Sequence, residues 1–174
     1  MSADDPLELI LMRHAEAEPL DPAVYPDDAA RPLTRHGRDV QRKVSRALKR
    51  LDCKPDWILA SPRVRARQTA EITAEVLAPR QGMRQQDALG GGYSVANALK
   101  MLLDFQEARC VLCVGHEPDL SEFAGALLGP GRGPSIRFKK SAVLGLGFRA
   151  HVVPGGAYLC YFYRPKDLLA LGNL

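Results

Sequence analysis

Two short apolar runs, each followed by a histidine, stand out in the pattern of hydrophobic and polar positions. The first covers residues 7–12 and leads into Arg13 and His14, and the second covers residues 110–114 and leads, after one glycine, into His116. Uninterrupted short runs of Leu, Ile and Val are typical of strands buried on both faces of a parallel sheet. Ligands of open α/β sheets bind beyond the carboxyl ends of the strands. We therefore expect both imidazoles at one edge of one sheet.

Four further stretches have strand character and complete the predicted sheet. Residues 56–60 form a second buried strand, and residues 83–87 form a short edge strand before the glycines at 90–92. No Gly-Lys-Ser/Thr follows these glycines, so we interpret them as a plain turn and not as a phosphate-binding P-loop. Residues 136–148 and 157–163 flank a Pro-Gly-Gly turn, which predicts an antiparallel hairpin at the sheet edge.

Helix signals separate these strands. Thr34 precedes an amphipathic stretch and is the predicted N-cap of a helix over residues 35–50. Ser61 followed by Pro62 predicts a second helix, with Ser61 as N-cap and Pro62 in the first helical position, that runs to about Leu77. Two more helices are predicted, over residues 94–105 and 118–128.

Alternating strands and helices predict an α/β fold. We expect a three-layer sandwich in which helices flank a mostly parallel central sheet, built as one domain over residues 1–174. A chain of this length buries roughly two-thirds of its unfolded surface, which is enough for a sizeable core. Residues 15–33, rich in Pro, Asp and Ala, are predicted to be a surface loop near the site, and residues 129–134 a second loop.

The composition excludes several classes of protein. With 46% hydrophobic and 25% charged residues, the chain is typical of a globular protein. No apolar run approaches the roughly 18 residues of a membrane span, and the acidic start at residues 1–5 is unlike a signal peptide. We expect a cytoplasmic protein without a membrane partner. The net charge of +4 favours anionic partners.

The cysteines are predicted to be structural. Cys110 and Cys113 form a C-x-x-C pair inside a predicted strand, where positions three apart point to opposite faces. They are therefore poorly placed for redox chemistry or for sharing a metal, and Cys53 and Cys160 are also interpreted as structural. The chain has no D-x-D-type carboxylate cluster for magnesium, so we expect no cofactor and no metal requirement.

Basic residues gather in two places. The helix over residues 35–50 carries many cations against the single acid Asp39. This face is either simply solvated or a docking surface for nucleic acid or an acidic protein, and the lack of interleaved aromatic residues favours the first interpretation. Arg63, Arg65 and Arg67 lie at the start of the next helix, where the helix dipole disfavours cations. Such a cluster indicates a phosphate site.

These residues together fit phosphoryl transfer. A neutral imidazole at His14 is able to attack phosphorus. Arg13 and Arg65 are suited to hold the phosphoryl oxygens by charge-assisted hydrogen bonds, and a protonated His116 adds another donor. By analogy with oxyanion holes, each well-placed donor contributes about 3–4 kcal/mol to the stabilisation of the transition state.

Four motifs resemble, in order, the landmarks of the histidine phosphatase (phosphoglycerate mutase-like) superfamily. They lie at Met12–Ala15, Leu33–Gly37, Ser61–Ala70 and Gly115–Pro118. The short chain, the Arg-Pro-Leu-Thr at residues 31–34 and the closing Tyr-Arg-Pro-Lys at residues 163–166 are most similar to the small SixA-type phosphohistidine phosphatases. The resemblance implies a phosphoglycerate mutase-like fold and phosphatase activity.

The resemblance also implies roles for individual residues. His14 is implied to be the nucleophile that becomes phosphohistidine, Arg13 and Arg65 the phosphate clamps, and His116 the second histidine of the phosphate pocket. Ser61 and Ser141 fall near this pocket in the same pattern. Lys139 and Lys140, just before Ser141, either edge the pocket or are simply solvated.

The sequence departs from the family pattern in three ways. Ala15 follows His14 where the family usually has glycine, which is acceptable if the φ angle of this residue is negative. Pro-Leu stands at residues 19–20 where many relatives have asparagine, and Ala-Leu-Gly-Gly at 88–91 replaces the general-acid glutamate of larger members. The candidates for a general acid are Asp87 and Glu16, together with Glu117, which is also a candidate for substrate binding.

The lack of the family's general-acid glutamate affects which substrate we expect. An alkoxide leaving group needs a proton, whereas imidazole is protonated near neutrality and needs far less help. The short stretch between Arg65 and His116 leaves little chain for a lid. We therefore expect a metal-independent phosphatase for phosphohistidine on a protein of the phosphorelay type. The alternatives are a phosphatase for small phosphorylated metabolites such as sugar phosphates or nucleotides, and a non-catalytic phosphoprotein-binding module. A nucleic-acid partner is the least favoured interpretation.

Overall fold

The computed structural model describes residues 7–129, 135–148 and 151–172. These residues contain one six-stranded sheet in the order β3-β2-β4-β1-β5-β6. The strands are β1 (Glu8–Arg13), β2 (Trp57–Ala60), β3 (Gly82–Gln85), β4 (Cys110–Gly115), β5 (Val143–Phe148) and β6 (Ala157–Tyr163). The first four are parallel to one another, and β5 runs antiparallel to both of its neighbours, β1 and β6. The predicted mostly parallel sheet is confirmed, and β6 runs in the same direction as β1.

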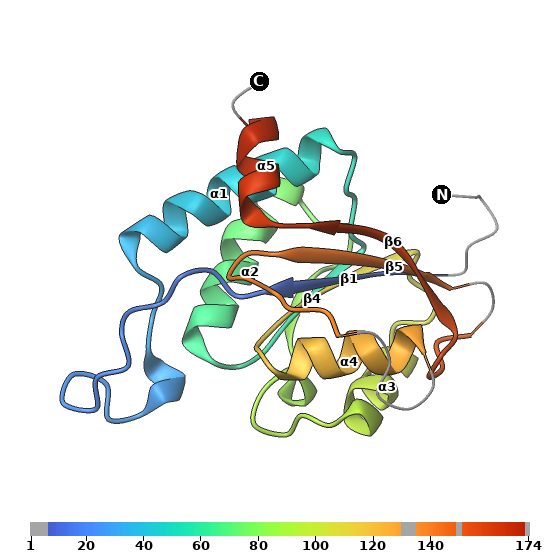
Figure 1. Cartoon of the computed structure of the whole chain (residues 1–174), viewed down its shortest axis with the longest axis horizontal. Coiled ribbons are helices and arrows are strands. Elements are labelled where there is room, and N and C mark those ends of the chain that lie inside the picture. The colour runs from blue at the N-terminus through green and yellow to red at the C-terminus, as the bar shows by residue number, and fades with distance from the viewer. Residues whose placement is uncertain (1–6, 130–134, 149–150, 173–174) are drawn as a thin grey trace.

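Helices cover both faces of the sheet (Figure 1). They are α1 (Arg35–Arg50), α2 (Val64–Leu77), α3 (Val95–Leu103), α4 (Asp119–Leu128) and α5 (Pro165–Gly172), with 3-10 turns η1 (Asp28–Ala30) and η2 (Asp87–Leu89). Along β1, Ile10 and Met12 pack with α1, α2 and α5, whereas Leu9 and Leu11 pack with α3 and α4. Successive residues of a strand point to opposite faces, so this alternation produces two apolar layers. The three-layer sandwich is confirmed.

The start of α1 agrees with its sequence signal, whereas the start of α2 does not. Thr34 is the N-cap of α1, and its hydroxyl accepts a hydrogen bond from the Gly37 backbone N–H at 2.8 Å. We predicted Ser61 as the N-cap of α2, but the helix begins at Val64 and its N-cap is Arg63. The Ser61 hydroxyl lies within 2.8 Å of His116 Nε2, so a contact across the sheet engages the predicted cap.

The stretch before β5 is also shorter in strand structure than we predicted. Residues 136–142 are irregular, and the strand covers only Val143–Phe148. Ser141 adopts a left-handed conformation with φ of 62°, which interrupts an extended run. Its backbone N–H donates to the carbonyls of Arg13 at 3.1 Å and His14 at 3.3 Å. The irregular segment is therefore fastened to the end of β1. The predicted hairpin of β5 and β6 at the sheet edge is confirmed.

Several other predictions are settled by the fold. The buried Cys110 and Cys113 belong to opposite apolar layers, and none of the four cysteines forms a disulfide. The edge strand β3 and the plain turn at residues 90–92 are present, while the predicted loop at 129–134 lies largely outside the described residues. No helix among the described residues is long and apolar enough to span a membrane.

Candidate active site

The two histidines that follow the apolar runs lie side by side. β1 and β4 are adjacent parallel strands, and Arg13 is paired with Gly115 across them. One residue further on, the His14 backbone N–H donates to the Gly115 carbonyl at 3.0 Å. The ring centroids of His14 and His116 are 5.1 Å apart. The predicted meeting of both imidazoles at one edge of the sheet is confirmed.

His14 is held as a neutral imidazole with one free nitrogen. Its Nδ1 lies 2.7 Å from the Ala15 carbonyl oxygen. Because a carbonyl only accepts hydrogen bonds, Nδ1 carries the proton and the lone pair is on Nε2. Burial lowers the pKa of His14 to about 3, and the nearby charges of Arg65 and Arg13 act in the same direction. At neutral pH this side chain is therefore uncharged and nucleophilic.

His116 is the second buried imidazole. Its Nε2 contacts the Ser61 hydroxyl at 2.8 Å, and its Nδ1 is buried without a hydrogen-bond partner. Burial lowers the pKa of His116 to about 3, and the neighbouring His14 and Arg65 also lower it. An anion placed beside Nδ1 would reverse this balance, because a negative charge favours the protonated ring.

Two arginines from different elements, Arg13 and Arg65, lie close enough to His14 for their charges to act on its imidazole. Arg13 Nη1 donates to the Phe138 carbonyl at 2.8 Å, and Arg65 donates to Asp28 through Nη1 (2.8 Å) and Nη2 (3.0 Å). The Nε atoms of both arginines are buried and have no partner. Burial lowers the pKa of both guanidinium groups, but arginine stays protonated in proteins. In the part of the chain that the structure describes, three buried side-chain nitrogens are thus left without a partner: Arg13 Nε, Arg65 Nε and His116 Nδ1.

One carboxylate that the sequence analysis missed lies among the cations. Asp28 Oδ1 accepts hydrogen bonds from Arg31 Nε at 2.9 Å and Nη2 at 2.7 Å, and Oδ2 contacts Arg65 Nη2. Arg63 Nη1 approaches Oδ2 at 3.6 Å. Partial burial raises the pKa of Asp28, but the hydrogen bond from Arg31 and the charge of Arg65 lower it overall. The only sequence signal was the Asp-x-x-Arg spacing in the loop predicted to lie near the site.

The backbone conformation at position 15 accepts alanine where the family usually has glycine. Ala15 is not among the described residues with a positive φ. Its N–H donates to Thr69 Oγ1 at 3.0 Å, and its methyl group packs with Ala17, Leu33 and Ile72. The methyl group that the sequence introduces is therefore buried in a small apolar cluster.

The remaining predicted site residues differ in their contacts and in their exposure. Glu117 accepts hydrogen bonds from the Phe138 N–H at 2.9 Å and the Ser121 hydroxyl at 2.6 Å. It lines, with Arg13, a cavity of about 710 Å³. Ser141 contacts the end of β1 through its backbone, while Lys139 and Lys140 are both exposed.

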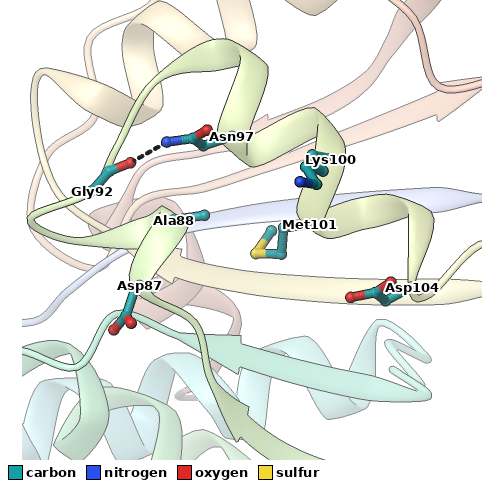
Figure 2. Close-up of a pocket in the computed structure, with 7 residues that line it drawn as sticks. All are labelled: Asp87, Ala88, Gly92, Asn97, Lys100, Met101 and Asp104. Atoms are coloured by element: carbon teal, nitrogen blue, oxygen red, sulfur yellow. Dashed lines mark hydrogen bonds between the residues drawn. The ribbon is translucent and has the colours of Figure 1, made fainter.

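Glu16 and Asp87, the two carboxylates predicted as general acids, have other surroundings than the two histidines. Glu16 accepts a hydrogen bond from the Thr34 hydroxyl at 3.3 Å. Figure 2 shows Asp87 at one side of a separate cavity of about 340 Å³ between η2 and α3. In the described part of the chain, no hydrogen bond or ion pair joins Asp87 or Glu16 to His14 or His116. Among the same residues, no three His, Cys, Asp or Glu side chains are placed to hold a metal ion.

Comparisons with known proteins agree with this geometry. Residues 9–90 match the model of the histidine phosphatase superfamily (branch 1). An uncharacterized protein of Picosynechococcus sp. (strain PCC 7002) is 37% identical over 145 residues, which cover 80% of this chain and 84% of that protein.

Solved structures give the same result. The protein histidine phosphatase SixA complexed with tungstate has a TM-score of 0.79 and 25% identity, over 93% of this chain and 99% of that one. A phosphoserine phosphatase from Entamoeba histolytica, complexed with 3-phosphoglyceric acid, has a TM-score of 0.66 and 18% identity, over 94% of this chain and 100% of that one. The fold is therefore SixA-like, and the chain belongs to the histidine phosphatase superfamily and is a phosphatase.

Proposed function

We propose that this phosphatase removes the phosphoryl group from phosphohistidine on a partner protein, through a covalent intermediate on His14. The observation that carries the proposal is the arrangement of unmatched nitrogens. Among the described residues, Arg13 Nε, Arg65 Nε and His116 Nδ1 are buried without partners; the His116 ring lies 5.1 Å from that of His14, and the charges of both arginines act on His14. Buried polar groups are rarely left unpaired, so such a set supports the binding of a phosphoryl group at this place.

In the first displacement, His14 Nε2 attacks phosphorus. The new N–P bond forms as the N–P bond of the substrate breaks, and the substrate imidazole leaves with its electron pair. If the other nitrogen of that imidazole carries a proton, it leaves as a neutral ring and needs no further acid. The proton on His14 Nδ1 stays there, hydrogen-bonded to the Ala15 carbonyl, and Arg13 and Arg65 stabilise the phosphoryl oxygens.

In the second displacement, water attacks phospho-His14. The N–P bond breaks, the electron pair returns to His14 Nε2, and phosphate leaves with the two protons of the water. The phosphoryl dianion favours protonation of His116, which then donates from Nδ1. Ser61 orients the ring through its contact with Nε2.

In the described residues no carboxylate is hydrogen-bonded to His14 or His116, and the nearby Asp28 is engaged by Arg31 and Arg65, which favours phosphohistidine over a phosphate ester. Neither Asp87 nor Glu16 contacts the histidines in the described residues, and Glu117 is engaged by Phe138 and Ser121. An ester would release an alkoxide, which needs a positioned acid. One of the solved structures described above, with a TM-score of 0.79, is a protein histidine phosphatase, which supports the same choice.

A phosphatase for small metabolites is the second candidate. The similarity of the fold to a phosphoserine phosphatase that binds 3-phosphoglyceric acid supports it. The third interpretation from the sequence was a non-catalytic phosphoprotein-binding module; membership of the histidine phosphatase superfamily favours a phosphatase over it.

The decisive experiment traps the intermediate and compares donors. The purified protein is mixed with a histidine-phosphorylated protein, a sugar phosphate or a nucleotide, in the presence of EDTA. We expect acid-labile phosphate on the wild-type chain but not on His14→Ala, and kcat/KM highest for the phosphohistidine protein. Activity of His14→Ala would overturn the mechanism, and a higher kcat/KM for an ester would overturn the substrate. Loss of activity in EDTA would overturn the expectation that no metal is needed.

A further inference from the structure

A further hollow lies between α1 and α5, lined in part by residues close to His14 in the sequence, and we call it the α1–α5 groove. Its volume is about 290 Å³, and its lining includes Glu16, His36, Val40, Lys140, Lys166 and Leu169. We propose that the α1–α5 groove docks an acidic segment of the phosphorylated partner protein and takes up one of its apolar side chains. This inference rests on the proposed function and concerns how the protein substrate is selected.

The position of the groove connects it to the proposed site. Glu16 is two residues beyond His14, and Ser141, which also lines the groove, donates its N–H to the carbonyls of Arg13 and His14. Because β6 runs in the same direction as β1, Lys166 follows its strand at the same edge of the sheet. Figure 1 shows α5 beside α1, directly after the end of β6. A peptide segment bound in the groove therefore lies next to the carboxyl end of β1.

The lining combines an apolar floor with a positive rim. Val40 and Leu169 are half-buried, whereas Lys140, Lys166 and His36 are exposed. In the described part of the chain, neither lysine forms a salt bridge. Glu16, the acid of the lining, accepts a hydrogen bond from Thr34.

This combination is complementary to an acidic protein segment with an apolar anchor. Apolar anchors supply binding energy in a pocket, and opposite charges at the rim supply selectivity and faster association. Beyond the groove, the exposed face of α1 carries the cations Arg35 and Lys43, with the single acid Asp39 between them. The basic helix that the sequence left open between solvation and docking therefore begins at the rim of this groove.

The test uses synthetic phosphohistidine peptides prepared with phosphoramidate. Their histidine is flanked by Leu and Glu, by Ala and Glu, or by Ala and Gln. We expect the wild-type kcat/KM to be about 10-fold higher for the Leu/Glu peptide than for the Ala/Gln peptide. The double variant Lys140→Glu, Lys166→Glu should lose most of the preference for Glu. Leu169→Ala should lose only the preference for Leu, and hydrolysis of phosphoramidate itself should not change in either.

Two controls keep the result specific. The double variant Lys49→Glu, Lys100→Glu makes the same change in net charge away from the groove, at the end of α1 and on α3. Arg137→Glu alters the larger cavity that is lined by Arg13 and Glu117. If either control removes the preference for Glu as strongly as the groove variant does, docking in the α1–α5 groove is wrong. A parallel loss of phosphoramidate hydrolysis in the groove variant would also overturn it.

Failure of the inference is distinguishable from failure of the proposed function. Equal kcat/KM for all three peptides in the wild type would reject the docking groove and leave phosphohistidine hydrolysis standing. Hydrolysis of an ester metabolite without hydrolysis of any phosphohistidine peptide would reject both. Inhibition by oligo(dT) that requires the groove lysines, with no preference among peptides, would assign the surface to nucleic acid instead.

Discussion

The two ends of the central sheet differ in whether their buried polar groups have hydrogen-bond partners. At the amino end of β4, Asp56 Oδ2 accepts from the N–H groups of Arg109 at 2.7 Å and Cys110 at 3.1 Å, and Oδ1 contacts Arg80. At the same end, Tyr161 donates to Glu8 at 2.8 Å.

At the carboxyl end, three buried side-chain nitrogens of the described residues have no hydrogen-bond partner. They belong to Arg13, Arg65 and His116. Buried polar groups without partners destabilise a fold. We therefore interpret the amino end, whose polar groups are paired, as contributing to stability, and the carboxyl end, with its unpaired nitrogens, as contributing to binding. This difference predicts that mutations at the two ends affect different properties.

The largest effect should come from Arg65→Gln at the carboxyl end. The variant keeps a polar side chain but is shorter and loses the charge that we assign to the phosphoryl oxygens. We expect kcat/KM to fall by about 10²–10³-fold, as for the loss of one oxyanion donor. The midpoint of thermal unfolding should change little, because Asp28 keeps its hydrogen bonds with Arg31. A large drop in stability with unchanged kcat/KM would reverse the assignment of the two ends.

Acid should destabilise the carboxyl end through its histidines. Both pKa values are about 3 in the folded chain, whereas unfolded histidine titrates near 6.5. Below that pH the unfolded chain therefore binds more protons. Stability is full above about pH 6.5 and falls by about 1.4 kcal/mol per pH unit for each histidine as the pH drops toward 3.

Urea unfolding between pH 7 and pH 5 measures this slope. The double variant His14→Asn, His116→Asn should flatten it. A slope in the variant as steep as that of the wild type would show that other groups control acid unfolding.

The amino end should respond to Asp56→Ala in the opposite way from Arg65→Gln. The substitution leaves the N–H groups of Arg109 and Cys110 without their acceptor. We expect a loss of about 2–3 kcal/mol in the free energy of unfolding, because at least one of these donors is buried. The kcat/KM of the fraction that remains folded should equal the wild-type value. Denaturant titration and steady-state kinetics on the same preparation test both halves.

The smallest effect is expected for Asp28→Asn, at the border of the cluster. The Asp28 carboxylate is bound by Arg65 and Arg31, so it competes with an incoming anion. Its removal should tighten inhibition by phosphate or tungstate by about 2–10-fold, equivalent to about 0.4–1.4 kcal/mol. Stability should change by less than about 1 kcal/mol, since the side chain is 39% exposed. Weaker inhibition would instead make Asp28 a residue that orients Arg65 for the phosphate.

Sequence reasoning performed best where a local pattern meets a general rule of topology. Two buried runs that end in histidine were enough to place His14 beside His116, because parallel strands share a carboxyl edge. The N-cap at Thr34 was correct, since a hydroxyl and a helical N–H three residues later meet locally.

The errors arose where distant contacts overrode local signals. Ser61 looks like a helix cap, yet His116 engages its hydroxyl from another strand. The strand predicted from residue 136 is interrupted because Ser141 bonds to the end of β1. Asp28 was missed because the path of a Pro-rich loop depends on the arginines that it meets, and these lie far away in the sequence.

The pairing of β1 with β4 also controls when an active molecule first exists. His14 is made early, yet its neighbour His116 and the Ser141 that holds the end of β1 are translated about a hundred residues later. A chain still growing on the ribosome therefore carries His14 before the strand that brings His116 beside it exists. Products of premature termination that stop before β4 should consequently lack phosphatase activity.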